Sequence, residues 1–201
     1  MTDGDYLVPR ARQVSTGLLS GLGPRWRHVV GVAQCAEEFA VGLDESECDQ
    51  VIAAAWLHDV GYAPTLVKTR LHALDGAAHL VVLGFPRVVT CLVAYHTGAT
   101  YEAEERGLVD ALLRFDVPAR HLLDTLTAAD LSVGPGGDRV NPLDRFAEIL
   151  ARYENQDPVH RAVMRSAPDL MGAVKRTEAR RLAAVVRGTS SPDVDAGATG
   201  V

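Results

Sequence analysis

The stretch AWLHDVGY, residues 55–62, ends an apolar segment with His58 and Asp59 side by side. More residues of these two types stand at or near the ends of other segments with a helical pattern of apolar residues, namely His28, His72, His96 and Asp130. A buried imidazole or carboxylate without a partner is costly, so several of them on apolar stripes need a common explanation. A shared site for one metal ion, or for two, provides that explanation.

The ligand types narrow the choice of metal. Neutral imidazole together with carboxylate suits Fe, Mn, Zn or similar ions, and the scarcity of thiolates argues against a structural zinc site. We therefore expect one or two such divalent metal ions as cofactor. Cys35, Cys48 and Cys91 form no C-x-x-C pair and lie inside helical patterns, which favours reduced thiols in a cytoplasmic protein over a disulfide framework.

Length and charge limit the possible partners. The chain has 201 residues, 47% of them hydrophobic, which suits one sizeable core rather than two independent domains. Its net charge of −6 argues against a nucleic acid as the main partner and is compatible with a small anionic ligand. The N-terminal residues lack the apolar core of a signal peptide, and no uncharged apolar run reaches about 18 residues, so no membrane is expected as a partner. The oligomeric state stays open.

Apolar residues recur three and four positions apart through most of the chain, which is the period of an amphipathic helix. Caps and breakers bound the expected helices at residues 26–41, 46–59, 71–83, 118–130, 142–153 and 169–187, with a further helix that ends at residue 96. Ser46 is the expected N-cap of the second of these. Because no alternating pattern long enough for a strand occurs, the sequence predicts an all-α fold.

The positions of these polar residues along their helices predict where their side chains point. His28, His96 and Asp130 lie on the apolar stripes of their helices, so the faces that pack into the core also carry these side chains inward. Three helices can then converge on the turn at His58 and Asp59. Consecutive side chains of a helix project about 100° apart, so this pair could straddle one ion, or Asp59 could bridge two.

Three segments, RWRHVVGVA (25–33), AWLHDVGY (55–62) and TAADLS (127–132), together resemble the H…HD…D signature of the HD-domain metal-dependent phosphohydrolases. Two more, HALDGA (72–77) and AYHTG (94–98), are similar to the extra histidine segments of HD proteins with a dinuclear centre. That subgroup includes the enzymes that cleave diadenosine tetraphosphate symmetrically. The resemblance implies an HD-domain-like helical bundle.

The resemblance covers about residues 20–155 and sets the expected domain organisation. We expect a single all-α domain over residues 1–187, with this core followed by C-terminal helices at 156–187. Residues 188–201, GTSSPDVDAGATGV, are expected to form a disordered tail because they carry almost no bulky apolar residue.

The resemblance also implies how the metals are held. The first metal would be bound by His28, His58, Asp59 and Asp130. The second would be completed by His72 and His96, with Asp59 bridging. His79 lies one heptad after His72 and competes for its role, although the resemblance aligns with His72. Many family members continue the HD turn with a lysine where this chain has Tyr62, so no role of that lysine is carried over.

From this site we predict a metal-dependent phosphohydrolase that cleaves a nucleotide or another small phosphate ester or anhydride through a metal-activated water. Asp59 and Asp130 are the candidate catalytic residues, with Asp130 as a candidate proton carrier. Basic residues that flank the ligand segments are candidates for binding the phosphorylated substrate, namely Arg25, Arg27, Lys68 and Arg70. We expect the pocket walls in the loops at 62–71, 98–107 and 132–141, which include Tyr62, Tyr101 and Arg139.

Two alternative functions remain open from the sequence. The six-ligand set also resembles that of the HD-type di-iron oxygenases, which cleave carbon–carbon or carbon–phosphorus bonds with O₂. A non-catalytic regulator that binds a metal or a nucleotide is the third reading. Iron content and O₂ uptake without phosphate release would indicate the oxygenase, and tight ligand binding without turnover would indicate the regulator.

Overall fold

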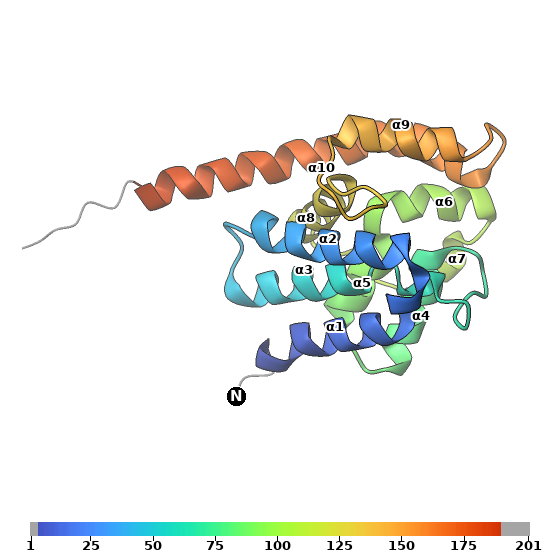
Figure 1. Ribbon diagram of the computed structural model, residues 1–201, viewed down its shortest axis with the longest axis horizontal. Coiled ribbons are helices and arrows are strands. Elements are labelled where there is room, and N and C mark those ends of the chain that lie inside the picture. Colours follow the sequence, from blue (N-terminus) through green and yellow to red (C-terminus); the bar gives the residue numbers. More distant parts are fainter. Residues whose placement is uncertain (1–3, 190–201) are drawn as a thin grey trace, which may run out of the picture.

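The computed structural model describes residues 4–189, and in this range the chain is helical with no β-strand (Figure 1). An isolated antiparallel bridge joins Val133 to Arg139. The α-helices are α1 (Gly4–Leu19), α2 (Pro24–Phe39), α3 (Glu45–Leu57), α4 (His72–Val82), α5 (Arg87–Tyr95), α6 (Ala99–Arg106), α7 (Val109–Leu112), α8 (Arg120–Leu131), α9 (Pro142–Arg152) and α10 (Pro158–Thr189). The predicted all-α fold is confirmed.

Helix α3 is the centre of the bundle and packs against α1, α2, α5 and α8. Its residues Ala53, Ala54, Ala55 and Leu57 are fully buried, and Trp56 is nearly so. A helix that is apolar on all sides is stable only when other helices surround it, and alanines let those helices approach closely. The end of α3, where His58 and Asp59 follow, is therefore deep inside the protein.

The start of α3 differs from the prediction. Asp44, rather than Ser46, is the N-cap: its carboxylate accepts a 2.8 Å hydrogen bond from the Glu47 backbone N–H. In return, the Glu47 carboxylate accepts a hydrogen bond of 3.3 Å from the Asp44 backbone N–H. This capping box satisfies two N–H groups that the first turn would otherwise leave unpaired, so it is preferred over a serine two residues later.

Other elements were not predicted or were predicted too short. Helices α1 and α7 were missed, and α6 lies where a loop was expected at 98–107. Helix α10 begins at Pro158 and continues through Pro168, although a proline inside a helix removes one backbone hydrogen bond. Contacts with α6, α8 and α9 stabilise α10 in spite of this loss.

Helices α9 and α10 lie together along one side of the bundle, and α10 extends past the ends of α2 and α3 (Figure 1). Helix α10 reaches Thr189, two residues beyond the predicted boundary of the domain. Most of the predicted tail, residues 190–201, lies outside the described residues. Within the described part of the chain, no helix combines the length and apolar character needed to cross a membrane.

Candidate metal centre

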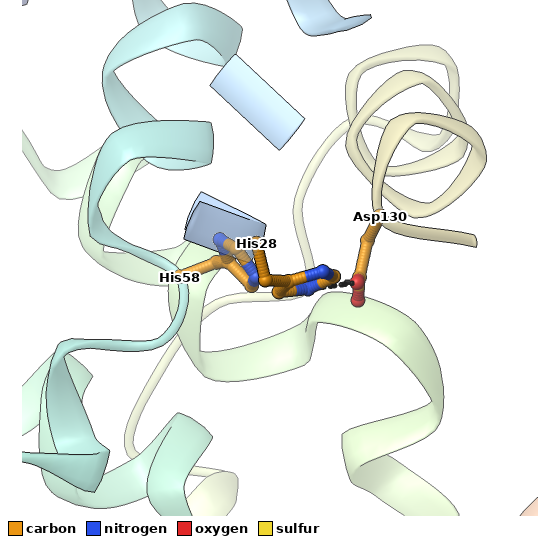
Figure 2. A group of neighbouring side chains, drawn as sticks. All are labelled: His28, His58 and Asp130. Carbon is orange, nitrogen blue, oxygen red and sulfur yellow. Dashed lines mark hydrogen bonds and ion pairs between the residues drawn. The ribbon is translucent and has the colours of Figure 1, made fainter. Parts of the chain in front are cut away.

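The six predicted ligand residues converge at one place in the bundle, where they form two neighbouring groups. The first group contains His28, His58 and Asp130, and the second contains Asp59, His72 and His96. In each group the candidate ligand atoms all lie within 4.8 Å of one another. Figure 2 shows the first group, whose side chains come from α2, the end of α3 and α8 and point toward one another.

Asp59 connects the two groups through its two carboxylate oxygens. Its Oδ2 lies 3.5 Å from Nε2 of His58, and its Oδ1 lies 3.5 Å from Nε2 of His72. The Oδ2 atom is also 4.0 Å from Nε2 of His28. This carboxylate therefore faces both groups, as a bridging ligand would.

Three of the histidines present the same ring nitrogen to the centre. The Nδ1–H groups of His28, His58 and His96 donate to backbone carbonyls of Gly134, Ala55 and Val93, at 3.2, 2.8 and 2.6 Å. A carbonyl oxygen only accepts, so in the neutral rings the proton is on Nδ1 and the Nε2 lone pair is left for another partner. Histidine ligands of metals are oriented by hydrogen bonds of this kind.

The surroundings of the His58 side chain show most directly whether a metal fits this site. Its side chain is fully buried, and its Nε2 has no hydrogen-bond partner within residues 4–189. A buried acceptor left unpaired costs about 1 to 3 kcal/mol, which a cation at this position would remove. Burial lowers the pKa of His58, while Asp59 and Asp130 act in the opposite direction, so the imidazole is in the neutral form that binds metals.

The separations between ligand atoms also suit a shared ion. Ligands bound to one ion at about 2.1 Å lie about 3 to 3.4 Å from each other. Nε2 of His28 is 3.0 Å from Oδ1 of Asp130, and Nε2 of His72 is 3.1 Å from Nε2 of His96. The donor set and its spacing therefore fit a divalent metal.

The other titratable groups of the centre are also in metal-binding forms. Burial acts to raise the pKa of Asp59, but His58 and Arg25 outweigh it and hold the pKa below the ordinary range of a carboxyl. The pKa of Asp130 is likewise low, because its close contact with His28 and the other nearby histidines outweighs burial. Burial lowers the pKa of His72 to about 3. At neutral pH the carboxyls are ionised and His72 is uncharged.

A stack of three side chains borders the second group. The Arg25 guanidinium donates a 2.6 Å hydrogen bond to Oδ2 of Asp59 and lies 3.9 Å above the ring of Tyr62. The Tyr62 ring is also stacked on the His72 ring, with 4.1 Å between the ring centroids. Tyr62, which stands at the lysine position of the family resemblance, thus holds a cation and a candidate ligand in place.

The chain after the HD turn approaches α4 so closely that position 61 must be glycine. A Cβ atom at Gly61 would lie 2.0 Å from the backbone oxygen of His72. The loop that follows is held by the buried Asp75 carboxylate, which accepts hydrogen bonds from the backbone N–H groups of Lys68 and Thr69. These contacts set the position of His72 relative to Asp59.

Of the four predicted phosphate-binding residues, only Arg25 lines the cavity at the metal centre. Arg27, Lys68 and Arg70 are exposed and are not among the described residues that line it. Arg27 is two residues from Arg25 on α2 and therefore points to a different side of the helix. Lys68 is fixed at its backbone by Asp75, and its side chain faces solvent.

The cavity walls also differ from the expectation. Tyr62 and Glu102, from the expected 62–71 and 98–107 segments, line the cavity. Tyr101 instead donates a hydrogen bond to Asp169, and Arg139 lies over the Phe39 ring. Residues of α9, of the turn after it and of the start of α10 complete the wall, including Arg145, Phe146, Arg152, Tyr153 and Val159. The sequence predicted α9 as a helix at 142–153, but nothing in the sequence placed this helix over the metal centre.

Comparison with known proteins identifies the family of this chain. The family model of the HD domain matches residues 25–183, which is more than half of the chain. The chain belongs to the HD domain family, and the resemblance noted in the sequence is confirmed. HD domains are typically metal-dependent phosphohydrolases, and the buried His and Asp groups are consistent with the metal site of the family. No curated protein and no solved structure gave a significant match to the chain.

Proposed function

We propose that this protein is a metal-dependent phosphohydrolase that cleaves a nucleotide or another small phosphate ester or anhydride. The observation that carries the proposal is the buried Nε2 of His58, which is unpaired within residues 4–189 and stands among ionised carboxylates beside a cavity lined by arginines. The same cavity holds metal ligand types and phosphate-binding cations, and a phosphohydrolase needs both.

We assign His28, His58 and Asp130 to one metal, and His72 and His96 to a second, with Asp59 shared between them. Divalent metals in such a site supply Lewis-acid chemistry, which makes water a stronger nucleophile near neutral pH and polarises a phosphoryl oxygen. The protein's own contribution is orientation. Each of the rings of His28, His58 and His96 is held by a backbone carbonyl, so the ligand atoms need little rearrangement.

The remaining residues of the cavity bind substrate and handle the proton. Arg25 already pairs with Asp59, so its guanidinium is close enough to the centre to contact a phosphoryl oxygen there. Asp130 lines the cavity and is ionised, and we assign it to take up the proton released by the attacking water. No nucleophilic side chain is required for this reaction.

The first experiment measures metal content by elemental mass spectrometry on protein purified without chelator. We expect about two equivalents in the native chain and a loss of metal in Asp59→Ala and His96→Ala. His79→Ala is the matched control, because His79 is on the same helix as His72 but outside both groups. Protein that binds no divalent metal under any refilling condition would overturn the proposal.

The second experiment separates the possible reactions. Phosphate release from a panel of nucleotides and small phosphate esters is expected from the metal-loaded chain and not from Asp59→Ala. Uptake of O₂ by an iron-loaded chain without phosphate release would indicate the HD-type oxygenase instead. Tight nucleotide binding without turnover, unaffected by Asp59→Ala, would indicate a regulator.

A further inference from the structure

A second cavity adjoins the one at the metal centre. Its volume is about 420 Å³, and it lies between the start of α2, the loop at Pro135 and α9. The two cavities share four lining residues, namely Arg25, His28, Arg145 and Arg152. A ligand bound at the metal centre could therefore extend past these arginines into the second cavity.

The polar groups of the second cavity are mostly cationic. Arg145 and Arg152 both donate hydrogen bonds to Glu148, so two positive charges share one carboxylate. Arg25, which also borders this cavity, pairs with Asp59 on the metal side. The α9 side of the cavity, with two arginines and one glutamate, therefore has a net charge of +1.

Arg145 is the unusual member of this group. The residue is 6% exposed, and its Nε–H has no acceptor within residues 4–189. The hydrogen bond that it does make leaves from Nη1. A buried guanidinium with an unused donor is costly unless an acceptor reaches it.

An ordinary helix ion pair does not explain this arrangement. Arg145, Glu148 and Arg152 are three and four residues apart, a spacing that is common on solvent-exposed helix faces. Such pairs contribute little to stability and stay on the surface. Here the most buried member, Arg145, lines both the cavity at the metal centre and the second cavity, where a ligand could reach it.

We propose that the second cavity is an oxyanion subsite, and that the substrate carries two anionic groups. One phosphoryl group would lie at the metal centre, and a second phosphoryl group would be bound by Arg145 and Arg152. Guanidinium groups suit this task because their planar set of N–H donors matches phosphate oxygens. This inference rests on the proposed phosphohydrolase function, since it extends the same site.

The test compares phosphonates, whose carbon–phosphorus bond a phosphohydrolase does not cleave. Calorimetry under nitrogen would measure the affinity of the metal-loaded chain for propylphosphonate and for straight-chain bisphosphonates with three to five carbons. We expect at least one bisphosphonate to bind about tenfold more tightly than the monophosphonate, because a second charged group finds hydrogen-bond donors. Exclusion of O₂ prevents oxidative cleavage of the probes.

Variants then test which residues bind the second phosphonate group of the probe. Arg145→Gln and Arg152→Gln are each expected to bring the affinity ratio down toward one. Arg161→Gln is the matched control, because Arg161 pairs with Glu105 and lines neither cavity among the described residues. If buried Arg145 is needed for folding, thermal unfolding will reveal it, and Arg152→Gln, whose side chain is 36% exposed, supplies the test.

The outcomes separate this inference from the proposed function. A ratio near one for every bisphosphonate, or a high ratio that survives Arg152→Gln, overturns the subsite. Hydrolysis of simple phosphate esters with a ratio near one would leave the proposed function standing and remove the subsite. A high ratio that falls in Arg152→Gln, without hydrolysis of any phosphate ester, would support the subsite and remove the proposed function.

Discussion

Thr97 donates a 2.5 Å hydrogen bond from its Oγ1 to Oδ2 of Asp130, and it does so from a left-handed backbone conformation with φ of 40°. A β-branched residue rarely adopts this conformation, which costs about 1 to 3 kcal/mol. The strained residue directly follows His96 in the chain. The fold thus keeps an unfavourable backbone at the point where two candidate ligands meet.

Replacement of the hydroxyl should weaken metal binding. In Thr97→Val the shape is kept but Oδ2 of Asp130 loses its donor, and we expect metal affinity to fall about 10- to 100-fold. Thr97→Ser keeps the hydroxyl and should retain the affinity. Competition with a metal indicator dye would measure both. Equal affinity in the native chain and in Thr97→Val would show that this hydrogen bond does not orient a ligand.

Gly61→Ala should be strongly destabilising. The added Cβ would lie 2.0 Å from the backbone oxygen of His72, so the HD turn and α4 must separate. We expect a loss of about 2 to 4 kcal/mol in the free energy of unfolding, measured with urea. Gly17→Ala, at an exposed position of α1 with open space around the new Cβ, should instead stabilise by about 0.5 to 1 kcal/mol. A Gly61→Ala chain as stable as the native one would contradict the close approach.

Loss of the Tyr62 ring should affect the second ligand group. Tyr62→Ala removes the surface that supports Arg25 and His72, and we expect about half of the bound metal to be lost and stability to fall by about 1 to 3 kcal/mol. Tyr62→Phe keeps the ring and should behave like the native chain. Elemental analysis and thermal unfolding would measure the two effects. Full metal content in Tyr62→Ala would argue against a supporting role.

The buried thiol of Cys35 should make stability depend on alkaline pH. Burial raises the pKa of this thiol from 9.0 to about 12, partly opposed by Arg139. Above pH 9 the unfolded chain releases the proton while the folded chain keeps it, so the free energy of unfolding falls as pH rises. The loss from this group is about 1.4 kcal/mol per pH unit above 9.

Urea unfolding at pH 8, 9 and 10 would test the effect, because these values span the pH at which the thiol of the unfolded chain begins to ionise while that of the folded chain, with a pKa of about 12, does not. Cys35→Ala should show a shallower decline than the native chain, and Cys48→Ala, which removes a half-buried thiol, should change the slope less. The same decline in the native chain and in Cys35→Ala would exclude this thiol as the cause.

Much of the fold was predictable because helix periodicity is a local property. Helix α2 was expected at 26–41 and runs over Pro24–Phe39, and α8 was expected at 118–130 and runs over Arg120–Leu131. The elements that the sequence predicted poorly are those whose stability comes from packing against neighbouring helices. Helix α10 passes through Pro168 because α6, α8 and α9 pack against it, and no local pattern contains that information.

The sequence by itself determined the fold class, the family and which six residues are candidate ligands, since apolar stripes and motif spacing are written along the chain. Only the tertiary structure decided how these residues meet. It placed Asp59 between the two groups, Thr97 on Asp130, and Arg145 in the cavity wall. The physical reason is that periodicity tells which face of a helix is buried, whereas the packing of helices far apart in the chain decides what that face touches.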